Sequence, residues 1–333
     1  MPRGFAKLRQ EPDWLSGILP AMKAEIGGLV ESQVWVEEDW QPWMKGRLIP
    51  TMRIDERKVD RNKSRLVAMG DRTEGNGIHF NAVATSMASA TAVKMTVSFA
   101  AGWRQLLYSI DFKQAFLQAY VENPNLLIDL PELPEEMQTG EFGSGKYKPG
   151  GGHSGKVGRL KKALYGLRDS PRLWQRFLIK FLTEEVGAQV MVSDRNVFKW
   201  KWQGQTLLAT VHVDDVLFTP SGKEIHAEFL RRIRLRFEIT GGVDPVSKFC
   251  GYEFRYDEHR QTITMHQESF ARAMLTKYGV LGSKPADTPM KVGALPLECR
   301  DGKATVRSTL EYAKFMWDLT WLTRINPRLS FVA

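Results

Sequence analysis

Two adjacent carboxylates, Asp214 and Asp215, interrupt the apolar run of residues 207–218. The apolar residues on either side predict two strands joined by a tight turn. Like charges a few ångströms apart repel each other, so carboxylates beside an apolar strand are costly unless they hold a cation. The alternative is that both are ordinary turn residues, because Asp is common in hairpin turns.

A third carboxylate, Asp111, ends the strand-like segment 106–110 earlier in the chain. Three carboxylates at the ends of apolar strands are the ligand set that two-metal phosphoryl transfer requires. Asp111 therefore shifts the interpretation of Asp214 and Asp215 from turn residues towards a site for divalent cations.

The composition is that of an ordinary soluble protein, with 333 residues of which 43% are hydrophobic and 26% charged. No apolar stretch approaches the roughly 20 residues that span a bilayer, so no membrane partner is expected. Only two cysteines are present, Cys250 and Cys299. This number argues against a disulfide framework or a structural zinc cluster and favours a reducing compartment.

The chain carries a formal net charge of +9, which favours polyanionic partners. Its basic residues form three clusters: Arg53, Arg57, Lys58, Arg61, Lys63 and Arg65; Arg159, Lys161, Lys162, Arg168, Arg172 and Arg176; and Arg231, Arg232, Arg234 and Arg236. One such cluster alone would be read as solvated surface. Three clusters interleaved with Trp and Tyr favour a nucleic-acid groove.

Helical and extended segments alternate irregularly along the chain, which predicts an α+β fold. Helices are expected at 13–33, from Thr85 or Ser86 to Gly102, from Ser170 as cap onwards, at 224–237, at 267–278 and at 308–323. Pro20 is expected to break or kink the first of these helices. Strands or hairpins are expected at 47–70, 106–111, 126–130, 196–202, 206–213, 215–219, 248–256 and 261–266. The Gly-rich segment 140–155 predicts a surface loop.

Five ordered blocks resemble the reverse transcriptase domain of Ty1/copia-type retrotransposons. They are 63–68, 110–117, 160–174, 213–215 and 249–253, of which 160–174 (LKKALYGLRDSPRLW) is the most specific. Segments 285–290 and 324–331 also resemble the part of that family that leads into its connection region. The resemblance runs from about Trp14 to the end of the chain.

The resemblance implies a right-hand polymerase with fingers, palm and thumb and an antiparallel palm sheet. The implied organisation is a helical lead-in at 1–33, fingers at 34–104, palm at 105–130, the Gly-rich loop at 131–158, fingers and palm helices at 159–195, palm with catalytic hairpin and primer grip at 196–256, and thumb with the start of the connection at 257–333. An RNase H domain is expected to be absent.

The resemblance also implies functional residues. Asp111, Asp214 and Asp215 would be the catalytic ligands of two Mg²⁺ ions, with Mn²⁺ as an alternative metal. The nucleotide would be bound by Arg53, Lys63, Arg65, Phe116, Tyr165 and Gly166. Phe116 falls where the family has an aromatic gate against the sugar 2′-hydroxyl, and the alternative is a core Phe.

The primer and template would be bound by Arg168, Arg172, His212, Phe249 and Gly251. The chain departs from the family at three positions. His212 stands where Tyr or Phe is usual, Met69 replaces a basic residue, and Asp169 replaces an uncharged polar residue. His212 is smaller and can ionise near neutral pH.

These observations favour an RNA-directed DNA polymerase that adds dNTPs to a primer on an RNA or DNA template. The alternative is a catalytically inactive, nucleic-acid-binding remnant of such a polymerase. A metal-dependent nuclease or phosphatase would leave block 160–174 unexplained. Another chain could supply integrase or RNase H, and family habit points to cytoplasmic virus-like particles, with the nucleus as a second location.

Overall fold

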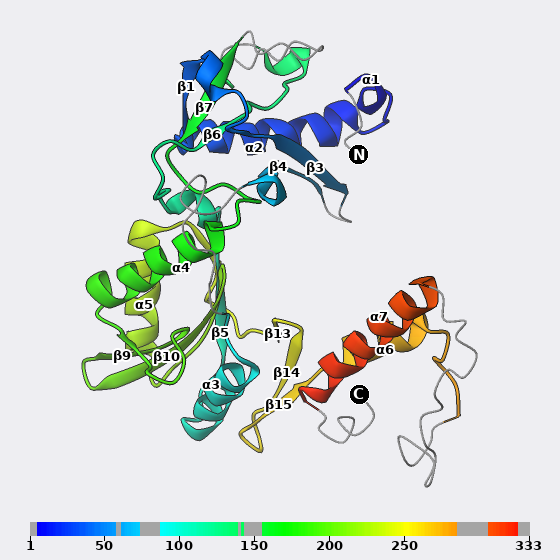
Figure 1. The fold of residues 1–333 in the computed structure, drawn as a ribbon. Helices are drawn as coiled ribbons and strands as arrows, with labels where there is room; N and C mark the ends of the chain where they lie inside the picture. Colours follow the sequence, from blue (N-terminus) through cyan, green and yellow to red (C-terminus); the bar gives the residue numbers. More distant parts are fainter. Residues whose placement is uncertain are drawn as a thin grey trace. The chain divides into compact units, whose positions relative to one another are not determined.

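The computed structural model describes residues 5–57, 61–73, 87–138, 141–142, 155–284 and 306–325. The chain divides into two compact units, each assembled from separated stretches (Figure 1). The first unit contains Met1–Met87, Phe112–Arg195 and Arg232–Thr240. The second unit contains Ala88–Asp111, Asn196–Arg231 and Gly241–Ala333. Helices and antiparallel sheets occur in both, and the predicted α+β class is confirmed. The linear domain boundaries stay a prediction.

The elements of the first unit are short. Its helices and strands are α1 (Phe5–Leu8), a π-helical turn (Trp14–Ile18), α2 (Leu19–Glu31), β1 (Trp35–Asp39), β2 (Leu48–Ile49), β3 (Thr51–Arg57), β4 (Asn62–Ala68), β6 (Leu127–Ile128), β7 (Lys156–Leu160), α4 (Ser170–Lys180), a second π-helical turn (Phe181–Glu185) and β8 (Gln189–Val190). Single 3₁₀ turns lie at Pro42–Met44, Gly70–Arg72, Ala115–Gln118 and Glu135–Met137.

The predicted helix 13–33 forms, with a change of helix type inside it. Its five apolar residues of one face are all buried: Trp14, Ile18, Met22, Ile26 and Leu29. Pro20 does not interrupt α2 because it lies in the first turn, where a missing N–H leaves no hydrogen bond unmade. The helix packs on β4 of the predicted hairpin, in which β3 and β4 pair antiparallel from Thr51↔Ala68 to Arg57↔Asn62.

A four-stranded sheet in the order β1-β7-β6-β2 completes the first unit. Strands β1 and β6 both pair antiparallel with β7, and β2 pairs parallel with β6. Gly158 lies at the centre of this sheet, where a Cβ would come within 2.9 Å of Ile128 Cγ1 and 3.2 Å of the Trp35 ring. A larger residue at that position would therefore displace side chains of both neighbouring strands.

The second unit contains the longer strands. Its elements are α3 (Ala90–Gly102), β5 (Tyr108–Phe112), β9 (Val197–Trp202), β10 (Gln205–His212), β11 (Asp215–Pro220), β13 (Lys248–Phe249), β14 (Tyr252–Asp257), β15 (Thr262–His266), α6 (Glu268–Lys277) and α7 (Val306–Thr323). Helix α5 (Lys223–Arg236) and strand β12 (Ile239–Gly241) include residues of both units.

Two antiparallel sheets organise the second unit. Strands β5, β11, β10 and β9 are neighbours in that order, and α3 packs on β10 and β11. Strands β13, β14 and β15 form the other sheet. None of the described helices has the length and apolar character needed to cross a membrane.

Two predicted helix starts need correction. Helix α3 ends at Gly102 as predicted, but its cap is Ser89, whose Oγ accepts a hydrogen bond from Ala92 N at 3.0 Å. Thr85 and Ser86 lie outside the described residues, as do most of segment 140–155 and all of 285–305. Ser170 is the first residue of α4 rather than its cap, because its hydroxyl donates to the Leu164 carbonyl at 2.7 Å.

Candidate active site

The catalytic hairpin predicted around Asp214 forms between β10 and β11. His212 lies opposite Asp215, which leaves Val213 and Asp214 as a two-residue turn. Val213 has a φ of +60°. A β-branched residue in this left-handed region is strained by about 1–3 kcal/mol, and such strain is concentrated at functional sites. The turn is therefore held by the paired strands rather than by its own preference.

Asp111 and Asp215 face each other across paired strands. Strand β5 pairs antiparallel with β11 in a register that puts Asp111 directly opposite Asp215. Like charges in such a position destabilise the sheet. Burial, together with the charges of Asp214 and Asp111, raises the pKa of Asp215 to about 6. The three predicted ligands are thus brought into one electrostatically coupled group.

The three carboxylates fit a divalent cation by their chemistry. Within the described part of the chain, no three His, Cys, Asp or Glu side chains converge closely enough to hold a metal ion. The donor set of Asp111, Asp214 and Asp215 is nevertheless all oxygen, which suits Mg²⁺ or Mn²⁺. A bound cation would also relieve the mutual repulsion of these carboxylates.

The predicted primer-binding residues His212 and Phe249 lie next to each other. Their ring centroids are 6.5 Å apart at an interplanar angle of 73°. Burial, with a smaller contribution from the charge of Arg324, lowers the pKa of His212 against the opposing effect of Asp214. The neutral imidazole is therefore favoured, which reduces the consequence of having an ionisable residue at this position.

Gly251 is required by the turn between β13 and β14. Cys250 and Gly251 have φ values of +47° and +76° and form the two-residue connection. A Cβ at Gly251 would lie 2.9 Å from Trp321 Cζ2. Burial and the charges of Asp215 and Asp214 raise the pKa of the Cys250 thiol to about 12, so this turn lies within electrostatic range of the carboxylates.

Three of the predicted nucleotide-binding residues contact one another in the first unit. The Phe116 and Tyr165 rings meet edge to face, with centroids 5.3 Å apart. The Arg65 guanidinium lies over the Tyr165 ring at 5.6 Å from its centroid. Phe116 is only partly buried, which differs from the alternative of a fully enclosed core Phe.

Gly166 lies where two backbone segments cross. Its φ is +86°, and a Cβ there would lie 2.1 Å from the Ala68 carbonyl oxygen. On the other side of the crossing, a Cβ at Gly70 would lie 2.1 Å from the Gly166 carbonyl oxygen. Ala68 N donates to the Tyr165 carbonyl at 2.7 Å. The crossing therefore fixes Tyr165 on the hairpin that carries Arg65.

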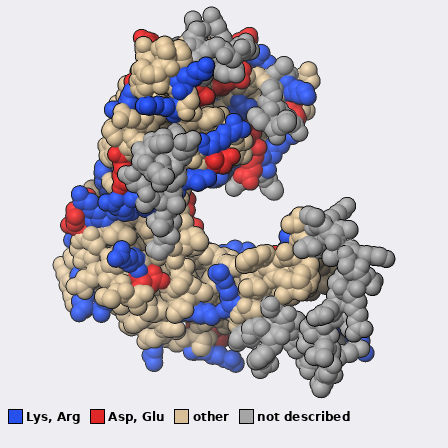
Figure 2. Space-filling model, viewed as in Figure 1, with Lys and Arg blue, Asp and Glu red and all other residues tan. Residues whose placement is uncertain are grey.

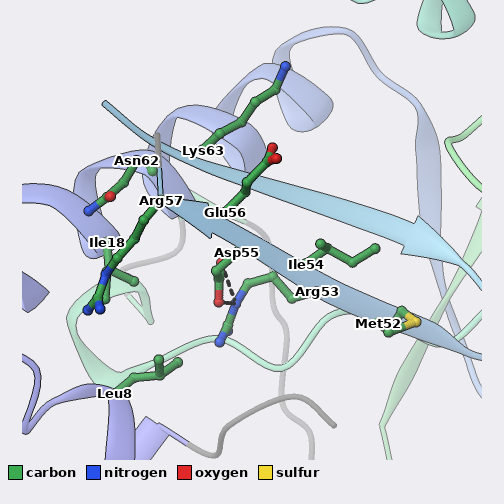
Figure 3. A pocket seen from close by; sticks show the side chains of 11 residues that line it. Leu8, Ile18, Met52, Arg53, Ile54, Asp55, Glu56, Arg57, Asn62 and Lys63 are labelled. Atoms are coloured by element: carbon green, nitrogen blue, oxygen red, sulfur yellow. Dashed lines mark hydrogen bonds and ion pairs between the residues drawn. The ribbon is translucent and has the colours of Figure 1, made fainter. Parts of the chain in front are cut away.

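Arg53 is separated from Lys63 and Arg65 by the hairpin itself. In the register of β3 and β4, Arg53 pairs with buried Leu66, whereas Lys63 and Arg65 belong to the opposite face. The Arg53 guanidinium bonds Asp55 at 2.8 Å and lies 4.7 Å from the Phe5 ring centroid. Figure 3 shows Arg53 and Asp55 on one side of the strands and Lys63 on the other.

The two predicted template-binding arginines have different environments. Arg168 is exposed. Arg172 is buried and donates to both carboxylate oxygens of Glu122, at 3.2 and 2.6 Å. These hydrogen bonds lower the pKa of Glu122, whereas burial raises the pKa of nearby Asp169. Arg172 is thus committed to an ion pair that the sequence did not reveal, because Glu122 is distant along the chain.

The basic clusters of the sequence are partly neutralised by carboxylates. Ion pairs join Arg57 to Glu11 and Asp13, Arg159 to Glu38, Arg176 to Glu122, and Arg231 to Glu228. In Figure 2, Asp and Glu are accordingly interspersed among the Lys and Arg side chains. The clusters are therefore a weaker sign of a nucleic-acid groove than their composition suggested.

The chain is similar to known proteins over most of its length. Residues 43–292 match the family described as reverse transcriptase (RNA-dependent DNA polymerase). A retrovirus-related Pol polyprotein from transposon TNT 1-94 of Nicotiana tabacum is 23% identical over 77% of this chain and 18% of its own length. The Pol polyprotein from transposon RE2 of Arabidopsis thaliana is 25% identical over 82% of this chain and 17% of its own length.

The chain thus spans less than a fifth of the length of the curated relatives that it matches. Among solved structures, a foamy viral protease-reverse transcriptase in complex with ds DNA matches with a TM-score of 0.43 and 13% identity. That match covers 90% of this chain and 47% of the other.

Proposed function

Because this chain belongs to the reverse transcriptase family of Ty1/copia-type transposons, we propose that it acts as an RNA-directed DNA polymerase. It would add dNTPs to the 3′-hydroxyl of a primer on an RNA or DNA template. The observation that carries the proposal is the strand register that sets Asp111 opposite Asp215, with Asp214 in the adjoining turn.

Asp111, Asp214 and Asp215 are the residues that would hold Mg²⁺ or Mn²⁺. The metal would supply Lewis-acid stabilisation of the charge that develops during phosphoryl transfer. The protein positions Asp111 and Asp215, because the strands that carry them, β5 and β11, pair antiparallel. The raised pKa of Asp215 supports a cation at this place, since the carboxylate is unfavourable there without one.

Lys63, Arg65, Phe116, Tyr165 and Gly166 would bind the incoming nucleotide. The cations of β4 would contact the triphosphate, where a fixed positive charge stabilises the transition state. The stacking of Arg65 on Tyr165 supports a preorganised guanidinium. Arg53 is the weakest member of the predicted set, because its guanidinium is bonded to Asp55.

The primer terminus would lie along His212, Phe249 and Gly251, and exposed Arg168 would contact the template. Arg172 would act indirectly, by fixing α4 through Glu122. The relatives are Pol polyproteins, so integrase or RNase H functions would come from other parts of such a polyprotein. We also propose that the protein acts in cytoplasmic particles that have access to the nucleus.

The second candidate function is binding without catalysis. The substitution of an aromatic residue by His212 is the observation that favours it. His212 adjoins the catalytic turn, so a poorly positioned primer terminus would stop the chemical step, whereas exposed Arg168 would still contact the template.

Primer extension on an RNA template tests the proposal. Purified protein is assayed with and without Mg²⁺, beside Asp214→Asn. We expect dNTP incorporation that requires the metal and disappears in the variant. A folded protein that binds primer–template but extends no primer would establish the binding remnant instead.

Replacement of Phe116 by Ala tests the proposed sugar gate. Removal of the ring is expected to let a ribonucleotide enter, so the ratio of kcat/KM for a dNTP over the matching rNTP should fall by at least about tenfold. Tyr165→Phe is the matched control, because it keeps the ring that meets Phe116 and removes only a hydroxyl. An unchanged ratio of dNTP to rNTP in Phe116→Ala would mean that Phe116 serves only in packing.

A further inference from the structure

The end of α7 is fixed on the turn between β13 and β14. The Trp321 indole stacks on the buried Tyr252 ring, with centroids 6.0 Å apart at 21°, and closely contacts Gly251. Its backbone carbonyl accepts a hydrogen bond from Gln267 Nε2 at 3.2 Å. Ile325 packs on the apolar core of the second unit. Several independent contacts thus hold this end of the helix in place, beyond the part of the chain that matches the family.

The same end of the helix presents an oriented cation. The Arg324 guanidinium lies 4.2 Å from the centroid of the Trp321 ring, within the range of a cation–π interaction. The Arg324 side chain is exposed. The next residue, Ile325, packs on the apolar cluster that contains Phe249. The Phe249 ring in turn lies 6.5 Å from the ring of His212, at the end of the catalytic hairpin.

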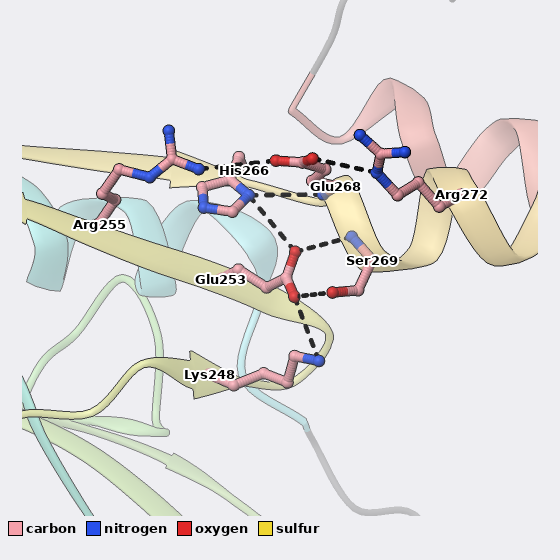
Figure 4. Close-up of polar contacts among 7 residues, drawn as sticks. All are labelled: Lys248, Glu253, Arg255, His266, Glu268, Ser269 and Arg272. Carbon is pink, nitrogen blue, oxygen red and sulfur yellow. Dashed lines mark hydrogen bonds and ion pairs between the residues drawn. The ribbon is translucent and has the colours of Figure 1, made fainter.

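Four other cations in this part of the second unit have carboxylate partners. Lys248 pairs with Glu253, and Arg255 and Arg272 pair with Glu268, as Figure 4 shows. Lys277 pairs with Asp318 at 2.6 Å. Arg324 has no carboxylate partner among the residues that the structure describes. A cation that is oriented by stacking and not neutralised is suited to bind an external anion.

We propose that Arg324 binds a backbone phosphate of the primer strand close to its 3′ end. The inference rests on the proposed function, because polymerisation requires the primer 3′-hydroxyl at Asp111, Asp214 and Asp215. Trp321 covers the Cys250–Gly251 turn, which follows Phe249. The Phe249 ring meets His212, the residue paired with Asp215. A strand that ends at the carboxylates can therefore pass this turn and meet the guanidinium.

The test is a thermodynamic cycle that compares wild type and Arg324→Ala on a series of primers. Each primer carries a single neutral methylphosphonate, placed at a different backbone position. Binding of primer–template is measured by fluorescence anisotropy in EDTA, so that no chemical step contributes. Arg324→Ala is expected to weaken binding about five- to twentyfold and to reduce the salt dependence by about one phosphate contact. One methylphosphonate position should weaken the binding of the wild type and leave that of the variant unchanged.

Two further variants separate contact from net charge. Arg324→Lys keeps the charge and is expected to retain part of the affinity. Arg260→Ala removes another exposed cation of the same unit and should leave the position-specific effect intact. The inference is overturned if every methylphosphonate affects wild type and Arg324→Ala equally, or if Arg324→Ala binds more tightly, which would mean that α7 obstructs the primer.

The binding cycle tests the contact of Arg324 with the primer, and the extension assay tests the polymerase proposal, so the two can be contradicted independently. Coupling at one primer phosphate without any extension would overturn the polymerase proposal and keep the contact of Arg324 with the strand. Extension by the wild type without coupling at any position would keep the polymerase proposal and overturn the inference.

Discussion

Replacing Asp215 by Asn is expected to abolish primer extension and, in the absence of metal, to stabilise the fold at neutral pH. Loss of the proposed metal ligand would remove several kcal/mol of transition-state stabilisation, about a thousandfold in rate. The gain in stability has a different origin. Burial and two neighbouring carboxylates raise the pKa of Asp215 from 3.8 to about 6, so the folded protein binds its proton more tightly than the unfolded chain does.

The expected gain in stability depends on pH, because only the ionised form of Asp215 is penalised in the folded protein. At a pH below about 4 the carboxyl is protonated in both states, and Asp215→Asn should hardly change the free energy of unfolding. As the pH rises to 6, ionisation increasingly penalises the folded wild type, and above 6 the full penalty is present. The variant should then be more stable by about 1–3 kcal/mol. Urea denaturation in EDTA at several pH values measures the difference.

Asp244→Asn is the control, because Asp244 is an exposed carboxylate of the same unit. It should not reproduce the pH-dependent gain. Excess Mg²⁺ should stabilise the wild type more than Asp215→Asn, since a ligand that binds only the folded state raises its stability. A metal-free Asp215→Asn protein that is less stable than the wild type at pH 7 would contradict the proposed mutual repulsion.

Replacing Gly166 by Ala is expected to be the most damaging of the glycine substitutions for the first unit. The new Cβ would meet the Ala68 carbonyl oxygen at 2.1 Å and Val67 Cγ1 at 2.4 Å, in a backbone conformation that Ala adopts only with strain. Backbone strain and overpacking together should lower the free energy of unfolding by at least about 3 kcal/mol. Urea denaturation measures the loss.

Gly187→Ala separates the two causes. Gly187 has a φ of +80° but no atom within 4 Å of the position of a Cβ, so only the backbone strain applies there. We expect a loss of about 1 kcal/mol. Equal losses in the two variants would mean that the crossing at Gly166 opens without resistance. A larger loss in Gly166→Ala, with a raised KM for dNTP, would link the crossing to the position of Tyr165.

The local elements follow from the sequence alone, whereas the pairing of β5 with β11 is what places Asp111 opposite Asp215. A turn inside an apolar run predicts a hairpin, and the spacing of apolar residues in 13–33 predicts the buried face of α2, because strand and helix periods depend only on neighbours in the chain. The family blocks also placed Phe116 and Tyr165 in one group, and their rings do meet.

Which cations lack a carboxylate partner depends on contacts between segments that are far apart in the chain. Arg53 and Arg65 belong to the same basic cluster, yet the pairing of β3 with β4 assigns them to opposite faces. Arg172 is neutralised by Glu122, whereas Arg324 is oriented by Trp321. Such differences arise from packing between segments that are distant in sequence, and local patterns do not encode the partner that a charged side chain will meet.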